Sequence, residues 1–131
     1  NVLEESVTGT RDRIDFKAPG KGHPVLCAAM KYTVDDVKIS GANSAKAGDS
    51  YPFSIRIMGG GRMTGDHIVR FEVIDPNDTI VEVHTRNAKT SQGRYRGHVP
   101  FALNAPAGIW RITARDIISG KSVTKKIELR Q

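Results

Sequence analysis

Acidic pairs are the side chains in this sequence that come nearest to a catalytic pattern. Hydrolysis of a glycosidic bond uses two carboxylates about 5–9.5 Å apart across a cleft. The pairs that could supply them are Glu4 with Glu5, Asp35 with Asp36, Asp66 with Glu72, and Asp75 with Asp78. Each is explained equally well as a terminal, turn or outward-facing strand residue. We therefore expect no catalytic residues, no cofactor and no enzymatic activity in this chain.

The histidines show no metal-ligand spacing. His23, His67, His84 and His98 are well separated along the chain, whereas zinc ligands usually come in closely spaced pairs. We expect these histidines at the surface or at strand ends, and no metal site.

Nucleophile and phosphate patterns are equally weak. Cys27 is the only cysteine and lies in an apolar run, where a thiol behaves as a small buried group, although His23 is near it in sequence. The glycines at 60 and 65 have the spacing of a phosphate loop, but Asp66 and His67 follow where Lys and Ser or Thr are required. We expect neither a reactive thiol nor a phosphate site.

Exposed aromatic rings could form a sugar-binding platform, and the chain contains eight aromatic residues. Phe53, Phe71, Phe101 and Trp110 share a phase with aliphatic residues and are the predicted structural core, as are Tyr51 and Tyr95. Phe16 and Tyr32 fall outside the pattern. These two rings are too few for an obvious platform. For the alternative that the chain binds carbohydrate, the candidate ligand-binding residues are Tyr32 and Tyr95.

After residue 50 apolar and polar residues alternate, and this pattern predicts strands with one face exposed to solvent. Turn residues such as Asp75-Pro76-Asn77-Asp78 separate the runs. The expected strands are 34–40, 50–58, 67–75, 79–86, 93–102, 108–117 and 121–130. The predicted fold class is all-β: an immunoglobulin-like two-sheet antiparallel β-sandwich of about seven strands.

The first 32 residues read as a separate part of the chain. Residues 33–131 are the predicted sandwich, and residues 1–32 an extended connector or the tail of an upstream unit. Short strands are expected at Val2-Leu3 and 13–16, with a glycine-rich mobile loop expected later at 59–65. The apolar run 24–30 could be a buried strand or a docked segment. Because the chain begins with Asn1, we expect that something upstream was removed.

Composition and charge narrow the class of protein to which this chain can belong. Its content of 38% hydrophobic and 26% charged residues is typical of a folded protein. No run approaches the roughly 20 apolar residues of a membrane span. The net charge is +6, but the cations are scattered over several expected strands without a basic run. We read them as solvated strand faces and expect no nucleic-acid partner.

Three stretches carry a family resemblance. They are Asp66 to Val73 followed by Asp75-Pro76, Val99 to Trp110, and Arg115 to Gly120, with Thr10 to Ile14 similar to a preceding connector. Together they resemble the C-terminal Ig-like β-sandwich region of bacterial secreted proteins related to β-galactosidase-type glycoside hydrolases. The stretch from Asn104 to Trp110 is also similar to macroglobulin-type and other bacterial Ig-like domains.

The resemblance implies an accessory role. In such proteins the catalytic carboxylates belong to a separate upstream barrel, so no catalytic residue carries over to this chain. We expect a non-catalytic module of a larger exported, carbohydrate-active protein. Its expected partners are neighbouring domains and, in the alternative that follows, carbohydrate. The alternatives are a carbohydrate-binding or adhesion domain and, last, a small stand-alone hydrolase.

Overall fold

The computed structural model describes residues 7–10, 13–16, 32–60 and 62–131. The chain divides into two compact units, residues 1–31 and residues 32–131. In the first unit β1 (Val7–Thr10) and β2 (Arg13–Phe16) form an antiparallel pair, so the strand expected at 13–16 is confirmed. The expectations for residues 2–3, Cys27 and the run 24–30 lie outside the described residues.

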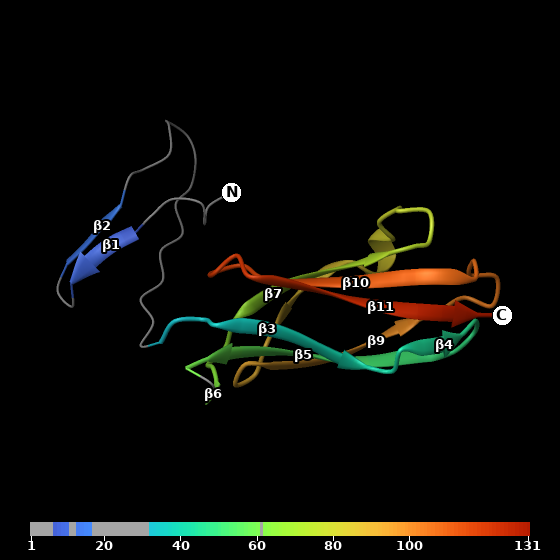
Figure 1. The fold of residues 1–131 in the computed structure, drawn as a ribbon, viewed down its shortest axis with the longest axis horizontal. Coiled ribbons are helices and arrows are strands. Elements are labelled where there is room, and N and C mark those ends of the chain that lie inside the picture. The colour runs from blue at the N-terminus through green and yellow to red at the C-terminus, as the bar shows by residue number, and fades with distance from the viewer. Residues whose placement is uncertain (1–6, 11–12, 17–31, 61) are drawn as a thin grey trace. The chain divides into compact units, whose positions relative to one another are not determined.

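The second unit consists of two stacked sheets (Figure 1). One sheet contains β3 (Asp36–Gly41), β5 (Ser50–Gly59), β6 (Arg62–Met63) and β9 (Arg94–Pro100). The other has the order β4 (Ser44–Lys46), β11 (Ser122–Arg130), β10 (Gly108–Asp116), β7 (Ile68–Ile74) and β8 (Arg86–Lys89). The predicted all-β Ig-like sandwich is confirmed.

The first segment of the sandwich changes sheets. β3 pairs antiparallel with β5, and β4 then pairs in parallel with the last residues of β11 in the opposite sheet. The segment that leads into β3 lies at one end of the sandwich, and the C-terminus lies at the other (Figure 1). The chain therefore enters and leaves the sandwich at opposite ends.

The core lies between the sheets and follows the period of two. Phe53, Phe71, Phe101 and Trp110 are all at most 5% exposed. Phe53 meets Phe71 edge-on at 5.4 Å between ring centroids, and Phe101 meets Trp110 at 5.0 Å. The buried indole nitrogen of Trp110 is also bonded: Nε1 donates to the Pro106 carbonyl at 2.9 Å. These contacts join the inner faces of both sheets.

The strand expected at 79–86 is wrong. Asp78 has a left-handed backbone (φ 62°), and beyond it only Ile80 bridges to Ile74. A short 3₁₀ helix, η1 (Glu82–His84), follows, and pairing with β7 resumes at β8. The alternation of Val81 and Val83 was misleading because Val83 is 78% exposed and packs against nothing inside.

The glycine-rich segment contains a short strand pair that the sequence did not predict. Met58 pairs with Met63, so β5 and β6 are antiparallel neighbours. The mobility expected for residues 59–65 stays a prediction. Burial in η1 and the nearby Arg86 charge lower the pKa of His84.

Among the described residues no helix is long and apolar enough to cross a membrane.

Replacing Phe71 by alanine should lower the free energy of unfolding by about 3–5 kcal/mol, because the ring fills the space between the sheets. Urea denaturation followed by the fluorescence of Trp110, the only tryptophan, measures the change. Leu103→Ala is the control, since Leu103 is 82% exposed and should shift stability by less than about 0.5 kcal/mol. Equal losses in the two variants would contradict the core described here.

Candidate functional site

A histidine and an aspartate are buried together at one end of the sandwich. His67 Nδ1 lies 2.7 Å from Asp116 Oδ1, and the two side chains are 1% and 0% exposed. Charged and polar groups are rarely buried without partners because desolvation is costly. This pair is therefore the strongest candidate for a functional site among the described residues.

Strand register explains why the two side chains meet. β7 and β10 are antiparallel neighbours, with Phe71 opposite Ala114 and Val69 opposite Asp116. Asp116 continues the inward phase of β10, and His67, two residues before Val69, continues the inward phase of β7. Since side chains alternate strictly between the two faces of a strand, both must point into the sandwich.

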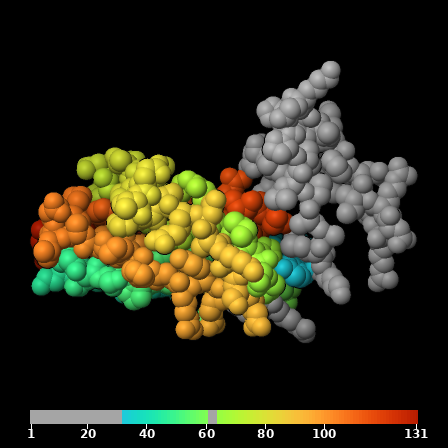
Figure 2. Space-filling view, turned by 180° about the vertical axis from the view of Figure 1, so that it is seen from behind, coloured from blue at the N-terminus to red at the C-terminus, as the bar shows by residue number. Residues whose placement is uncertain are grey.

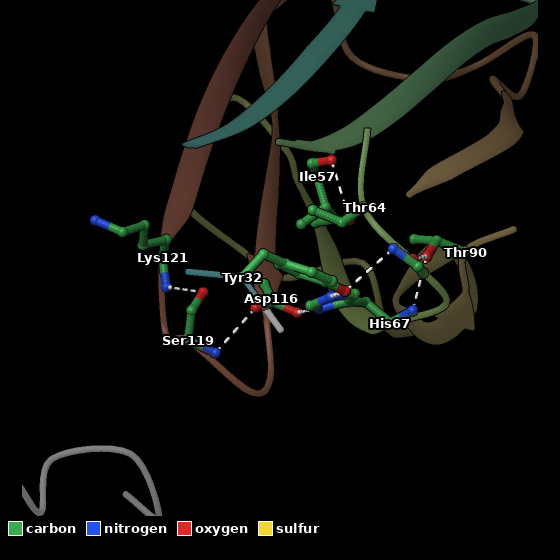
Figure 3. A network of polar contacts seen from close by, with 9 residues as sticks. Tyr32, Ile57, Thr64, His67, Thr90, Asp116, Ser119 and Lys121 are labelled. Atoms are coloured by element: carbon green, nitrogen blue, oxygen red, sulfur yellow. Dashed lines mark hydrogen bonds and ion pairs between the residues drawn. The ribbon is translucent and has the colours of Figure 1, made fainter. Parts of the chain in front are cut away.

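Tyr32 and Thr90 complete a network around His67: Tyr32 contacts the imidazole, and Thr90 bonds to the His67 backbone (Figure 3). The Tyr32 hydroxyl lies 2.7 Å from His67 Nε2 and accepts a hydrogen bond from the Gly65 amide at 3.1 Å. The His67 amide donates to Thr90 Oγ1 at 2.8 Å, and the Thr90 amide donates to the His67 carbonyl at 2.8 Å. Segments distant in sequence thus converge on one histidine.

The second oxygen of Asp116 is also occupied. It accepts the Ser119 amide at 2.9 Å, which fixes the turn between β10 and β11. Among the described side chains, no buried nitrogen or oxygen atom lacks a hydrogen-bond partner. The network is closed, and a closed buried network fixes one arrangement of the chain.

The order carboxylate, imidazole, hydroxyl is the order that activates a nucleophile in many enzymes. If His67 Nδ1–H donates to Asp116, Nε2 can accept the proton of the Tyr32 hydroxyl. A substrate would have to reach that hydroxyl. Two surface hollows among the described residues, of ≈ 480 and ≈ 360 Å³, include no member of the network. The hydrogen bonds themselves tie Tyr32 to the ends of β7 and β10.

The acidic pairs from the sequence do not face a common cleft. Asp75 accepts the amides of Asn77 and Thr79 and forms a turn. The remaining described members are engaged as follows: Asp35 with the Gly60 amide, Asp36 with the Val37 amide, Glu72 with Arg70, and Asp78 with Arg111. Glu4 and Glu5 lie outside the described residues.

Asp66 is next to the network in sequence but outside it in space. The Gln92 amide donates to its carboxylate at 3.0 Å, and Lys89 lies 3.2 Å away. The Gln92 hydrogen bond, followed by Lys89, holds the pKa of Asp66 below its usual range. The group stays an exposed carboxylate.

The two tyrosines proposed as ligand-binding residues make separate contacts. Tyr32 is half-buried and belongs to the histidine network. Tyr95 is half-buried, with ring centroids 6.3 Å from Phe53 and 5.6 Å from Phe71. The structure places one in a polar network and the other at the margin of the core, without joining them in a platform.

His67 lies just before the start of β7, which agrees with the expectation of strand-end histidines, but its burial, with 4% of the residue exposed, was not predicted. A signal was present in the sequence. His67 continues the phase of Val69, Phe71 and Val73, and Asp116 continues that of Trp110, Ile112 and Ala114. A polar residue that extends an inward phase at each of two strand ends indicates a buried pair. Within the part of the chain that is described, no group of three or more His, Cys, Asp or Glu side chains could hold a metal ion.

No protein-family model and no curated protein matches this sequence. Solved structures match the fold. The CARDB domain of the PF1109 protein from Pyrococcus furiosus, in complex with di-metal ions, is 15% identical with a TM-score of 0.53, covering 78% of this chain and 97% of that chain. The superoxide reductase (neelaredoxin) from Ignicoccus hospitalis is 8% identical with a TM-score of 0.52, covering 74% and 82%.

A β-glucosidase from Listeria innocua, in complex with isofagomine, is 12% identical with a TM-score of 0.48, covering 82% of this chain and 18% of that chain. At such low identities, the two matches with TM-scores above 0.5 show a likeness of fold alone.

Removing the Tyr32 hydroxyl tests the anchor. Tyr32→Phe leaves His67 Nε2 and the Gly65 amide without their partner, so the free energy of unfolding should fall by about 1–3 kcal/mol. Tyr95→Phe is the matched control, because no described residue bonds to its hydroxyl. Chemical denaturation of both variants measures the difference, and equal effects would contradict the anchoring role.

The buried pair itself should be strongly coupled. Asp116→Ala should cost about 3–5 kcal/mol of stability, because it leaves the His67 imidazole and the Ser119 amide unpartnered in the interior. In a double-mutant cycle with His67→Ala, the coupling free energy should lie at about 0.5–3 kcal/mol. Additive losses would mean that the two side chains act independently.

Proposed function

We propose that this chain is a non-catalytic accessory β-sandwich module of a larger exported protein, which packs against, spaces or orients neighbouring domains. The observation that carries the proposal is the internal use of the side chains that could form a site. The aromatic rings of residues 32–131 pack in or against the core, and the Asp116–His67–Tyr32 arrangement is closed by its own hydrogen bonds.

The shape of the sandwich supports a spacing role. The unit starts and finishes at opposite ends of its long axis, so domains joined at its two ends would be held apart by the length of the strands (Figure 1). The Tyr32 anchor would then set the direction in which the chain enters, because the tyrosine is held by both the His67 side chain and the Gly65 backbone.

The exported and carbohydrate-active context that we propose for the parent protein rests on the sequence resemblance of the stretches around Asp75-Pro76 and Trp110. The fold likeness to the CARDB domain agrees with a small β module and adds no substrate.

Two measurements test the accessory role. The full chain should show no turnover on a panel of glycosides and polysaccharides. Deleting residues 32–131 from the parent polypeptide should lower the melting temperature of the adjacent domain by a few degrees, roughly 2–8 °C for each kcal/mol of lost contact, while its active site keeps the same substrates. Turnover that disappears in Tyr32→Phe would instead establish the hydrolase alternative.

A further inference from the structure

The outer face of the β3–β5–β9 sheet collects basic side chains that are far apart in sequence. Tyr51, Phe53, Ile55 and Ile57 point inward from β5, so the even-numbered residues face outward. The register then places Lys38 opposite Arg56, and Arg56 opposite Arg94. Arg96 and His98 follow Arg94 along the same face of β9.

These groups form a compact array. Neighbouring strands are roughly 4.8 Å apart, and successive residues on one face of a strand are roughly 6.7 Å apart. Arg56 therefore has a cation on each side across the sheet. Like charges directly opposite each other destabilise a sheet, so hydrogen bonding and packing within the sheet do not explain the array.

Few carboxylates offset this charge. Asp36 is the one acidic residue among the outward-facing positions of β3, β5 and β9, and its oxygen lies 3.9 Å from Lys38 Nζ. No described carboxylate forms an ion pair with Arg56, Arg94 or Arg96.

The opposite face of the sandwich also carries cations, and three of its arginines have acidic partners: Arg70 with Glu72 at 3.2 Å, Arg111 with Asp78, and Arg130 with Glu128 at 3.0 Å. Arg56, Arg94 and Arg96 differ from these three arginines because no described carboxylate pairs with them.

A hollow lies within the basic face. Gly41, Phe53 and Gly97 form one row across the three strands. All three positions have the inward phase, so this row presents only its backbone to the outer face and forms the floor of the hollow. Its volume is ≈ 360 Å³, and Ser40, Pro52, Ser54 and Arg96 form its rim. A Cβ atom at Gly97 would lie 2.9 Å from the Phe53 ring, which explains the glycine there.

We propose that this face, defined by Lys38, Arg56, Arg94, Arg96 and His98, binds an anionic polysaccharide. The cations would pair with carboxylate or sulfate groups, and the serine hydroxyls at the hollow would bond to sugar hydroxyls. Single-stranded nucleic acid is bound through stacked bases, and this face exposes no aromatic ring. A membrane surface is bound through inserted apolar side chains, and the exposed large apolar residues lie elsewhere: Ile68, Ile80, Val83, Leu103 and Ile109.

The test uses the full chain with polygalacturonate and heparin as carboxylated and sulfated probes, and dextran as the uncharged control. Binding is measured by calorimetry and affinity electrophoresis. The expected result is binding to at least one anionic probe and not to dextran, with affinity falling steeply between about 50 and about 200 mM NaCl as counterions are released.

Matched variants locate the site. Lys38→Gln, Arg56→Gln and Arg96→Gln combined should weaken binding roughly tenfold or more. Arg111→Gln, Arg115→Gln and Lys126→Gln combined remove the same charge from the other sheet and should change affinity less than about twofold. Arg56→Gln alone should raise the melting temperature at low salt, since it relieves repulsion within the row.

Several outcomes would overturn the proposal. They are equal loss of binding in both triple variants, absence of binding to both anionic probes, and tighter binding to DNA or to anionic vesicles than to either polysaccharide. The proposal is independent of the accessory role, because deletion of the unit tests domain packing and these variants test one face.

Discussion

The antiparallel register between β7 and β10 is the constraint on which the rest of the sandwich depends. β10 is the central strand of the larger sheet and β7 is its neighbour, and both contribute buried apolar side chains to the inner surface. With Phe71 opposite Ala114, the large side chain of one strand meets the small side chain of the other. A slip of one residue would turn Arg70 and Glu72 into the core, so the hydrophobic effect selects a single register.

The buried pair is a consequence of the same register. The inward phase of both strands runs one position beyond the last apolar residue, to His67 and Asp116. Two polar groups are then forced into the end of the core, where each compensates the other. Tyr32, Thr90 and the Ser119 amide satisfy the remaining donors and acceptors. The hydrophobic core therefore ends in a layer of hydrogen bonds, and that layer fixes the chain entering β3.

Most of the sandwich could be predicted because its strands alternate clearly. The phase of Phe53, Phe71, Phe101 and Trp110 was visible from local sequence, since a period of two needs no knowledge of partners. The strand expected at 79–86 was wrong because, of the two alternating valines, only Val81 packs against the core, whereas Val83 is exposed in η1. β4 and β6 were missed because three- and two-residue strands exist only through their pairing.

The candidate sites could not be predicted because they depend on contacts between distant residues. His67 and Asp116 are 49 residues apart, and Lys38 and Arg94 meet only through β5. In the sequence the same arginines are scattered without a basic run. The strand register brings residues that are scattered in the sequence next to each other. This register cannot be derived from a single sequence.

The placement of the two ends of the sandwich also has a mechanical meaning. The chain enters β3 at one end of the sandwich and reaches the C-terminus at the other (Figure 1), so tension between these two ends acts along the strands. The space-filling surface in Figure 2 shows the segments that follow β7 laid along this axis. The β3–β5 and β4–β11 pairings would be loaded in shear, where the hydrogen bonds of a pair share the force, and none could be opened one at a time as in a zipper. A module built in this way resists stretching most strongly in the direction in which its own chain passes through it.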